Sequence, residues 1–124
     1  STMAQAQENV KVANQMKANT FAQKENEAIK KAVEAFQSYR QIPCTECGYC
    51  QPCPEGVAIP DIFSLYNEGK MFGVMETAIT QYRTLFSSKH KADRCVACGK
   101  CETLCPQGLP IIDLLKQCHE ALNS

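Results

Sequence analysis

Eight of the nine cysteines fall into two short runs of closely similar spacing. The first run is CTECGYCQPCPEG, from Cys44 to Gly56, and the second is CVACGKCETLCPQG, from Cys95 to Gly108. Both read C-x-x-C-G-x-C, followed after two or three residues by C-P-x-G. Thiolates packed this densely are the soft ligands that zinc and iron–sulfur clusters prefer. The two runs therefore predict metal binding by a pair of related loops.

The spacing suits a four-iron cubane better than a single ion. A C-x2-C-x2-C run can reach three corners of a cubane, whereas a structural zinc ion typically takes a pair of ligands from each of two separated knuckles. The second run, through Cys105 and Pro106, matches the C-x2-C-x2-C-x3-C-P pattern of two-cluster bacterial ferredoxins. In that pattern the fourth cysteine serves the other cluster. The first run departs from it by one residue before Cys53.

This exchange of the fourth ligand predicts two [4Fe–4S] clusters, each held by both runs. One cluster is expected on Cys44, Cys47, Cys50 and Cys105. The other is expected on Cys95, Cys98, Cys101 and Cys53. These eight cysteines are the predicted metal-ligating and cofactor-binding residues, and no catalytic residue is predicted. A particular sample can be cluster-loaded, apo or zinc-loaded, according to its preparation.

Alternatives remain open at this point. Two structural zinc sites in an assembly module would use the same eight thiols. A disulfide framework fits less well, since no secretory signal is visible. An independent α-helical ferredoxin subunit of a redox complex would carry the same loops. The ninth cysteine, Cys118, lies on an apolar stripe and is expected to be a small core residue.

The elements that must position these loops are expected to be helices. Apolar residues at helical spacing predict helices over residues 3–40, 60–66, 72–86 and 110–122, with a break near residues 14–20. A capping box at Thr20 and Gln23 is expected to open the second N-terminal piece. No alternating strand pattern is found, so the fold class is all-α: an α-helical ferredoxin-like domain over residues 42–124 after a helical segment, residues 1–41.

Prolines and glycines around the cysteines have expected roles. Pro54 and Pro106 stop a helix from continuing, and Gly56 and Gly108 give the chain freedom to turn away from the cluster. Gly48 and Gly99 are expected to let amide groups approach sulfur. An apolar wrap around the clusters is predicted from Ile42, Tyr49, Val57, Ile59, Val96, Leu104 and Leu109.

Composition excludes several classes of function. With 13 basic and 13 acidic side chains the formal net charge is zero, so the basic excess typical of nucleic-acid binding is missing. No signal peptide and no apolar run of membrane-spanning length is visible. Free thiols without a secretory signal predict a cytoplasmic location. The chain does not begin with Met, which favours a fragment of a longer protein.

The segment IPCTECGYCQPCPEGVAIPDIF, from Ile42 to Phe63, resembles the C-terminal iron–sulfur domain of certain microbial aldo/keto reductases. The shortened spacing before Cys53 is shared with that family. CVACGKCETLCPQGLPI, from Cys95 to Ile111, is similar to the family's second loop, and STMAQAQENVKVAN, residues 1–14, resembles its final barrel-side helix.

The resemblance implies a parent oxidoreductase in which a nicotinamide-binding (β/α)8 barrel precedes this domain. The implied partners are that barrel and a redox donor or acceptor protein. None of the barrel's catalytic residues has a counterpart in this chain, so the fragment alone is not expected to reduce a carbonyl.

Overall fold

The computed structural model describes residues 2–17 and 20–124. The elements in chain order are α1 (Met3–Gln15), α2 (Gln23–Tyr39), α3 (Ile59–Met71), α4 (Met75–Thr84), the short 3-10 helix η1 (Ala92–Arg94), α5 (Lys100–Leu104) and α6 (Ile111–Leu122). The described residues contain no strand, so the all-α prediction is confirmed. None of the helices formed by these residues has the length and apolar character needed to cross a membrane.

The chain divides into two compact units, Ser1–Ala35 and Phe36–Ser124. The first unit holds α1 and most of α2, none of whose residues is buried. The predicted break between these helices is present between Gln15 and Gln23, and residues 18 and 19 within it lie outside the described part of the chain.

The predicted capping box at Thr20 is wrong. The Thr20 hydroxyl instead donates to the carbonyl of Lys17, and the Glu25 carboxylate accepts the N–H of Ala22 before α2. A capping box does occur at Thr2 and Gln5, at the start of α1. Thr2 and Thr20 are each followed three residues later by Gln. The sequence pattern alone therefore does not tell which of them caps a helix.

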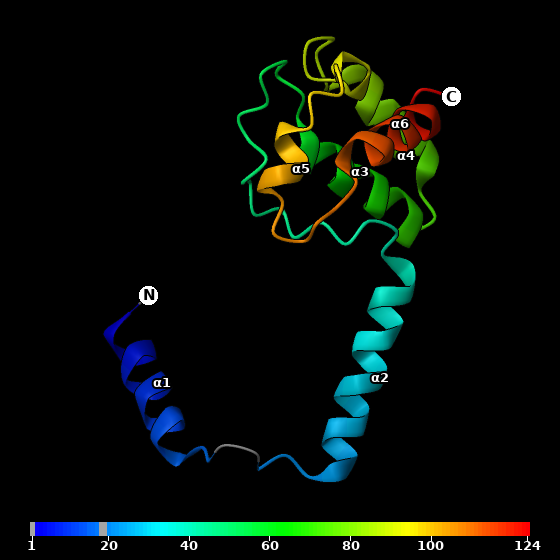
Figure 1. Ribbon diagram of the computed structural model, residues 1–124. Coiled ribbons are helices and arrows are strands. Elements are labelled where there is room, and N and C mark those ends of the chain that lie inside the picture. The colour runs from blue at the N-terminus through cyan, green and yellow to red at the C-terminus, as the bar shows by residue number, and fades with distance from the viewer. Residues whose placement is uncertain (1, 18–19) are drawn as a thin grey trace. The chain divides into compact units, whose positions relative to one another are not determined.

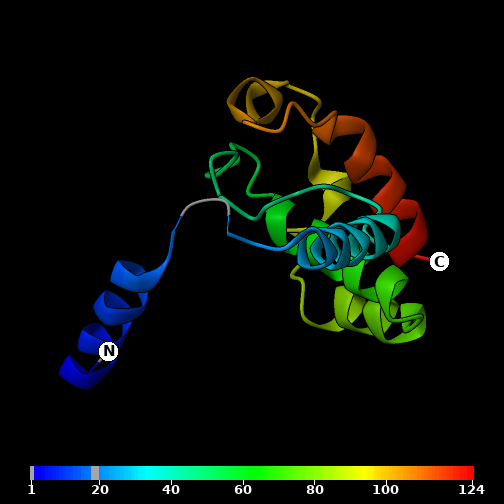
Figure 2. The same cartoon turned by 90° about the horizontal axis from the view of Figure 1, so that it is seen from below.

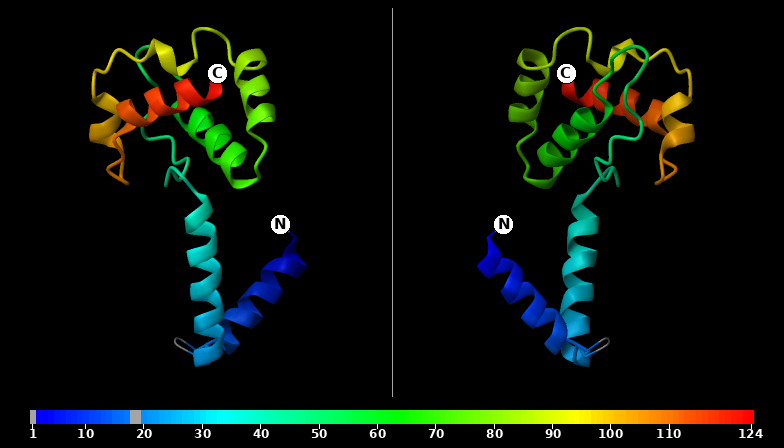
Figure 3. Two further views of the ribbon diagram at one scale, coloured as in Figure 1. Left: turned by 90° about the vertical axis from the view of Figure 1, so that its right-hand side faces the viewer. Right: turned by 90° about the vertical axis from the view of Figure 1, so that its left-hand side faces the viewer.

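The second unit is built on α3, α4 and α6, which pack against one another (Figures 1 and 3). Their inward faces form one apolar core. Its fully buried members are Ile42, Val57, Ile59, Ile62, Phe63, Tyr82, Ile111, Leu115, Cys118 and Leu122. Helix α3 continues to Met71, five residues past its expected end, whereas α4 is shorter than expected. Leu85, which lies within the expected helix over residues 72–86, is beyond the end of α4 and is 74% exposed.

The two cysteine runs lie side by side at one end of the second unit (Figures 1 and 2). The first run is an irregular loop between α2 and α3. The second run begins after η1 and contains α5, so a predicted loop is in part a one-turn helix. Each run leads directly into a long core helix, α3 or α6, which ties the position of the cysteines to the core.

Candidate metal centres

The sequence repeat is also a repeat of backbone conformation. Glu46 and Ala97 both have positive φ, at 56° and 55°, and so do Gly48 and Gly99, at 77° and 76°. Each pair is 51 residues apart, as Cys44 and Cys95 are. Left-handed residues alternating with ordinary ones turn successive N–H groups toward one side, which favours an anionic group there. In the first loop the N–H of Glu46 donates to Cys44 Sγ at 3.4 Å.

The two loops end in matching turns. The N–H of Gly56 donates to the carbonyl of Cys53 at 2.9 Å, and the N–H of Gly108 donates to that of Cys105 at 3.0 Å. Both glycines have positive φ, which supports their predicted role in turning the chain. The predicted role of Gly48 and Gly99, which is to let amide groups approach sulfur, stays a prediction. Their positive φ is an additional reason for glycine at both positions.

Side-chain hydrogen bonds fix the first loop at its entry and its exit. The side chain of Asn67 in α3 accepts the N–H of Ile42 at 2.9 Å and donates to its carbonyl at 2.8 Å. The side chain of Gln51 donates to the carbonyl of Val57 and accepts the N–H of Cys53. Sequence reasoning missed both residues, because a single Asn or Gln whose partner is set by the fold leaves no spacing signal.

The second loop is held by Tyr82 and Glu102. The buried N–H of Ala92 donates to the Tyr82 hydroxyl at 2.9 Å, and that hydroxyl lies 3.0 Å from His119 Nδ1. Ala92 in turn accepts the N–H of Cys95. The Glu102 carboxylate accepts the N–H of Ile112 in the first turn of α6. Burial raises the pKa of Tyr82, which keeps its phenol neutral and able to donate to His119.

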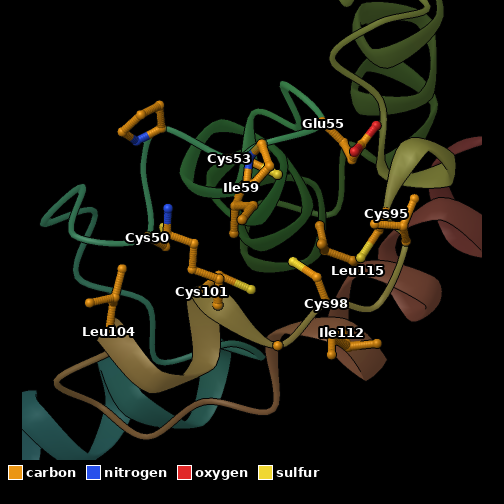
Figure 4. Close-up of a pocket in the computed structure, with 15 residues that line it drawn as sticks. Cys50, Cys53, Glu55, Ile59, Cys95, Cys98, Cys101, Leu104, Ile112 and Leu115 are labelled. Carbon is orange, nitrogen blue, oxygen red and sulfur yellow. The ribbon is translucent and has the colours of Figure 1, made fainter.

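The eight predicted ligands line two pockets, and Cys50 lines both of them. The first pocket contains Cys50 and Cys53, from the first run, with Cys95, Cys98 and Cys101 from the second. The second pocket contains Cys44, Cys47 and Cys50 from the first run, with Cys105 from the second. Figure 4 shows the sulfur atoms of Cys98 and Cys101 on one side of the first pocket, with Cys53 across from them. Each pocket thus combines the first three cysteines of one run with the last cysteine of the other, and Cys50 also borders the first pocket.

The sulfur donors of each pocket are spread around its lining and are not gathered at one point. Within residues 2–17 and 20–124, no three His, Cys, Asp or Glu side chains converge closely enough to hold one metal ion. Four sulfur donors spread around a pocket fit a cubane, which presents its four irons at separate corners.

Exposure differs among the ligand candidates in the same way in both pockets. Cys47 and Cys98, the second cysteine of each run, are exposed, whereas Cys101 is buried and the other five are half-buried. Burial raises the pKa of Cys44, Cys50 and Cys101, and that of Cys50 reaches about 11. Neighbouring thiolates add to this effect at Cys50, where Cys44 belongs to its own pocket and Cys101 to the other. Ligation must therefore drive deprotonation at these sites.

The predicted apolar wrap is only partly correct. Ile42, Val57, Ile59 and Leu109 are buried. Val96 and Leu104 line the first pocket, although they are 62% and 48% exposed. Tyr49 is 65% exposed and lines neither pocket, so its predicted packing role is wrong. Ile112 and Leu115 of α6 line the first pocket and were not predicted. The apolar spacing over residues 110–122 predicted their helix but not the pocket that they line.

A comparison with protein-family models matches residues 43–109 to the 4Fe-4S dicluster domain. This match covers more than half of the chain and both cysteine runs. The chain belongs to the 4Fe-4S dicluster domain family. It therefore binds two [4Fe–4S] clusters, and the all-sulfur donor sets of the two pockets fit them. This result favours the iron–sulfur interpretation over the zinc module.

A curated relative is the acetyl-CoA decarbonylase/synthase complex subunit alpha 1 of Methanosarcina barkeri (strain Fusaro / DSM 804), 27% identical over 77 residues. The match covers 61% of this chain and 8% of that relative. The chain thus spans a small fraction of the relative's length. No solved structure matched significantly.

Proposed function

We propose that this chain is the electron-transfer part of a larger oxidoreductase, with two clusters ligated crosswise by its two cysteine runs. The observation that carries the proposal is the sharing of each pocket between runs: Cys53 lines the same pocket as Cys98, and Cys105 lines the same pocket as Cys47. Each cluster, when bound, takes up and releases one electron at a time. The protein holds the clusters, limits their contact with water and adjusts their potentials through its own hydrogen bonds.

Electron exchange with a redox partner protein is proposed at the exposed cysteines. Cys47 and Cys98 bring the edge of each pocket to the surface. The remaining ligands are half-buried or buried, so a partner can approach each site from one side. Residues 42–124 carry the clusters in this proposal, and residues 1–41 lead into them.

The proposed parent is an aldo/keto reductase whose barrel ends within residues 1–41, which then continue as a linker helix. Its support is the resemblance over Ile42–Phe63, including the two-residue spacing before Cys53. The alternative is a segment of a multi-subunit redox complex, which the match to a subunit of such a complex favours. The reading frame upstream of Ser1 decides between them, because only the first predicts a barrel encoded there.

Metal analysis of an anaerobic preparation tests the function. The chain is expected to contain about eight irons and as many acid-labile sulfides, with broad absorption near ~400 nm. Cys98→Ala should lose about half of the iron, whereas Cys118→Ala should keep it, because Cys118 lines neither pocket. Fewer than about three irons in the unmodified chain, with no acid-labile sulfide, would refute the proposal.

A further inference from the structure

The two pockets meet at a wall made by two residues. Cys50 and Ile59 line both pockets, and every other lining residue belongs to one of them. Cys50 is a predicted ligand of one cluster, so its place at that cluster needs no further explanation. Ile59 has no donor atom in its side chain, and its position between the two sites is the feature to be explained.

The sequence repeat supplies a natural comparison for Ile59. Ile111 occupies the equivalent position of the second copy, as the first residue of α6 where Ile59 is the first residue of α3. The N–H of Ile59 donates to the carbonyl of Val57 at 3.0 Å, and the N–H of Ile111 donates to that of Leu109 at 2.8 Å. The two side chains are 1% and 2% exposed. They share a residue type, a backbone turn and a degree of burial.

They differ in what they face. Ile111 lines only the pocket of Cys44, Cys47, Cys50 and Cys105. Ile59 lines that pocket and also the pocket of Cys53, Cys95, Cys98 and Cys101. Figure 4 shows the Ile59 side chain near Cys50, Cys53 and Cys101, which include predicted ligands of both clusters. The two copies of the repeat therefore differ where the pockets meet. Only the first copy supplies an apolar side chain, that of Ile59, which lines both pockets.

We propose that Ile59 is the apolar partition between the two clusters and sets the reduction potential of both, whereas Ile111 sets that of one. This inference rests on the proposed function. A buried side chain of this size excludes water from both sites, and water stabilises the reduced form of a cluster, which carries more negative charge. Its hydrocarbon also leaves the charges of the two clusters poorly screened from each other, so that a second electron enters less readily than the first.

The test compares Ile59→Val with Ile111→Val in the cluster-loaded chain, with the two Ala variants as larger steps. Iron and sulfide are measured first, and each variant is then titrated with dithionite and followed by electron paramagnetic resonance. Ile59→Val should move both midpoint potentials in the positive direction and narrow the gap between them. Ile111→Val should move one. Where the reductions of the two clusters overlap in the titration, Ile59→Val should shift the whole titration curve to a more positive potential. Ile111→Val should separate the curve into two steps.

The outcomes separate the inference from the function on which it rests. An unmodified chain without about eight irons contradicts the cluster function itself. A fully loaded chain in which Ile59→Val moves one potential, or neither, overturns the partition and leaves the function standing. Equal shifts of both potentials by Ile59→Val and Ile111→Val would also overturn it, because a general loosening of the core would then explain both.

Discussion

Among single residues, Cys118 shows how the fold separates a structural thiol from ligating ones. It lies on the buried face of α6, fully enclosed, and lines neither pocket. Burial raises its pKa to about 12. A thiol held neutral in this way is a poor nucleophile and a poor ligand. The sequence-based expectation of a small core residue is confirmed.

The stability of the loaded protein should therefore fall at high pH through Cys118. Its ordinary pKa is 9.0, so below pH 9 the thiol is neutral in both the folded and the unfolded chain, and its contribution is complete. Between pH 9 and about 12 the unfolded chain ionises first, which costs the folded state about 1.4 kcal/mol per pH unit. Thermal melts of the unmodified chain should show this loss as a falling Tm.

Cys118→Ala is the matched control for that loss. The variant lacks the thiol and should be less stable at pH 8 by about 1 kcal/mol, the typical cost of a single substitution. Because the variant has no thiol to ionise at this position, its Tm should fall less as the pH rises above 9. Its Tm should therefore approach and then exceed that of the unmodified chain. A constant difference in Tm from pH 8 to pH 11 would contradict a neutral, buried thiol.

At the scale of elements, the cysteine loops depend on left-handed residues at fixed positions. Gly99 and Ala97 lie two residues apart with φ of 76° and 55°. A residue with a Cβ loses about 1–2 kcal/mol in this conformation, whereas glycine adopts it freely. Gly99→Ala should thus lower stability by about 1–2 kcal/mol, since no atom crowds the added Cβ. Ala97→Gly should raise it by a few tenths to about 1 kcal/mol, after the entropy of the unfolded chain is counted.

Tm measurements on the cluster-loaded variants check both the predicted decrease for Gly99→Ala and the predicted increase for Ala97→Gly. Gly73→Ala serves as a control, because Gly73 has a φ of 67° and open space but lies between α3 and α4, away from both pockets. It should lower Tm as Gly99→Ala does while leaving the absorption spectrum unchanged. An increase in Tm on Gly99→Ala, or a decrease on Ala97→Gly, would show that loop conformation is not the source of the effect.

The sequence predicted those elements whose signals are local. The helix at residues 110–122 and the paired turns at Gly56 and Gly108 follow from periodicity and from glycine placement, and the structure agrees closely with them. Helix α5 was missed because its five residues, KCETL, are too few for a periodic pattern and lie within the ligand motif. Ile59 was predicted as part of the apolar wrap around the clusters, but its position between the two sites was not, because the motif does not say how the two loops pack together.

At the scale of the whole second unit, the two copies depend on each other. Each pocket is lined by cysteines of both runs, and α3 and α6, which follow the runs, pack against each other in the core. Binding of either cluster therefore draws both runs and both core helices together. Cluster loss should lower the stability of the entire unit rather than of one loop, because ligation free energy is then also folding free energy.

Pairs of substitutions test this interdependence through iron content alone. Cys53→Ala combined with Cys98→Ala removes two ligands from one pocket, so the double variant should keep about four irons, as each single variant does. Cys53→Ala combined with Cys47→Ala damages both pockets and should leave almost no iron. If each run instead held its own cluster, the two results would be exchanged, because Cys53 and Cys47 would then share a site. The comparison is between two double variants with equal numbers of lost thiols, so a general weakening of the fold cannot produce the difference.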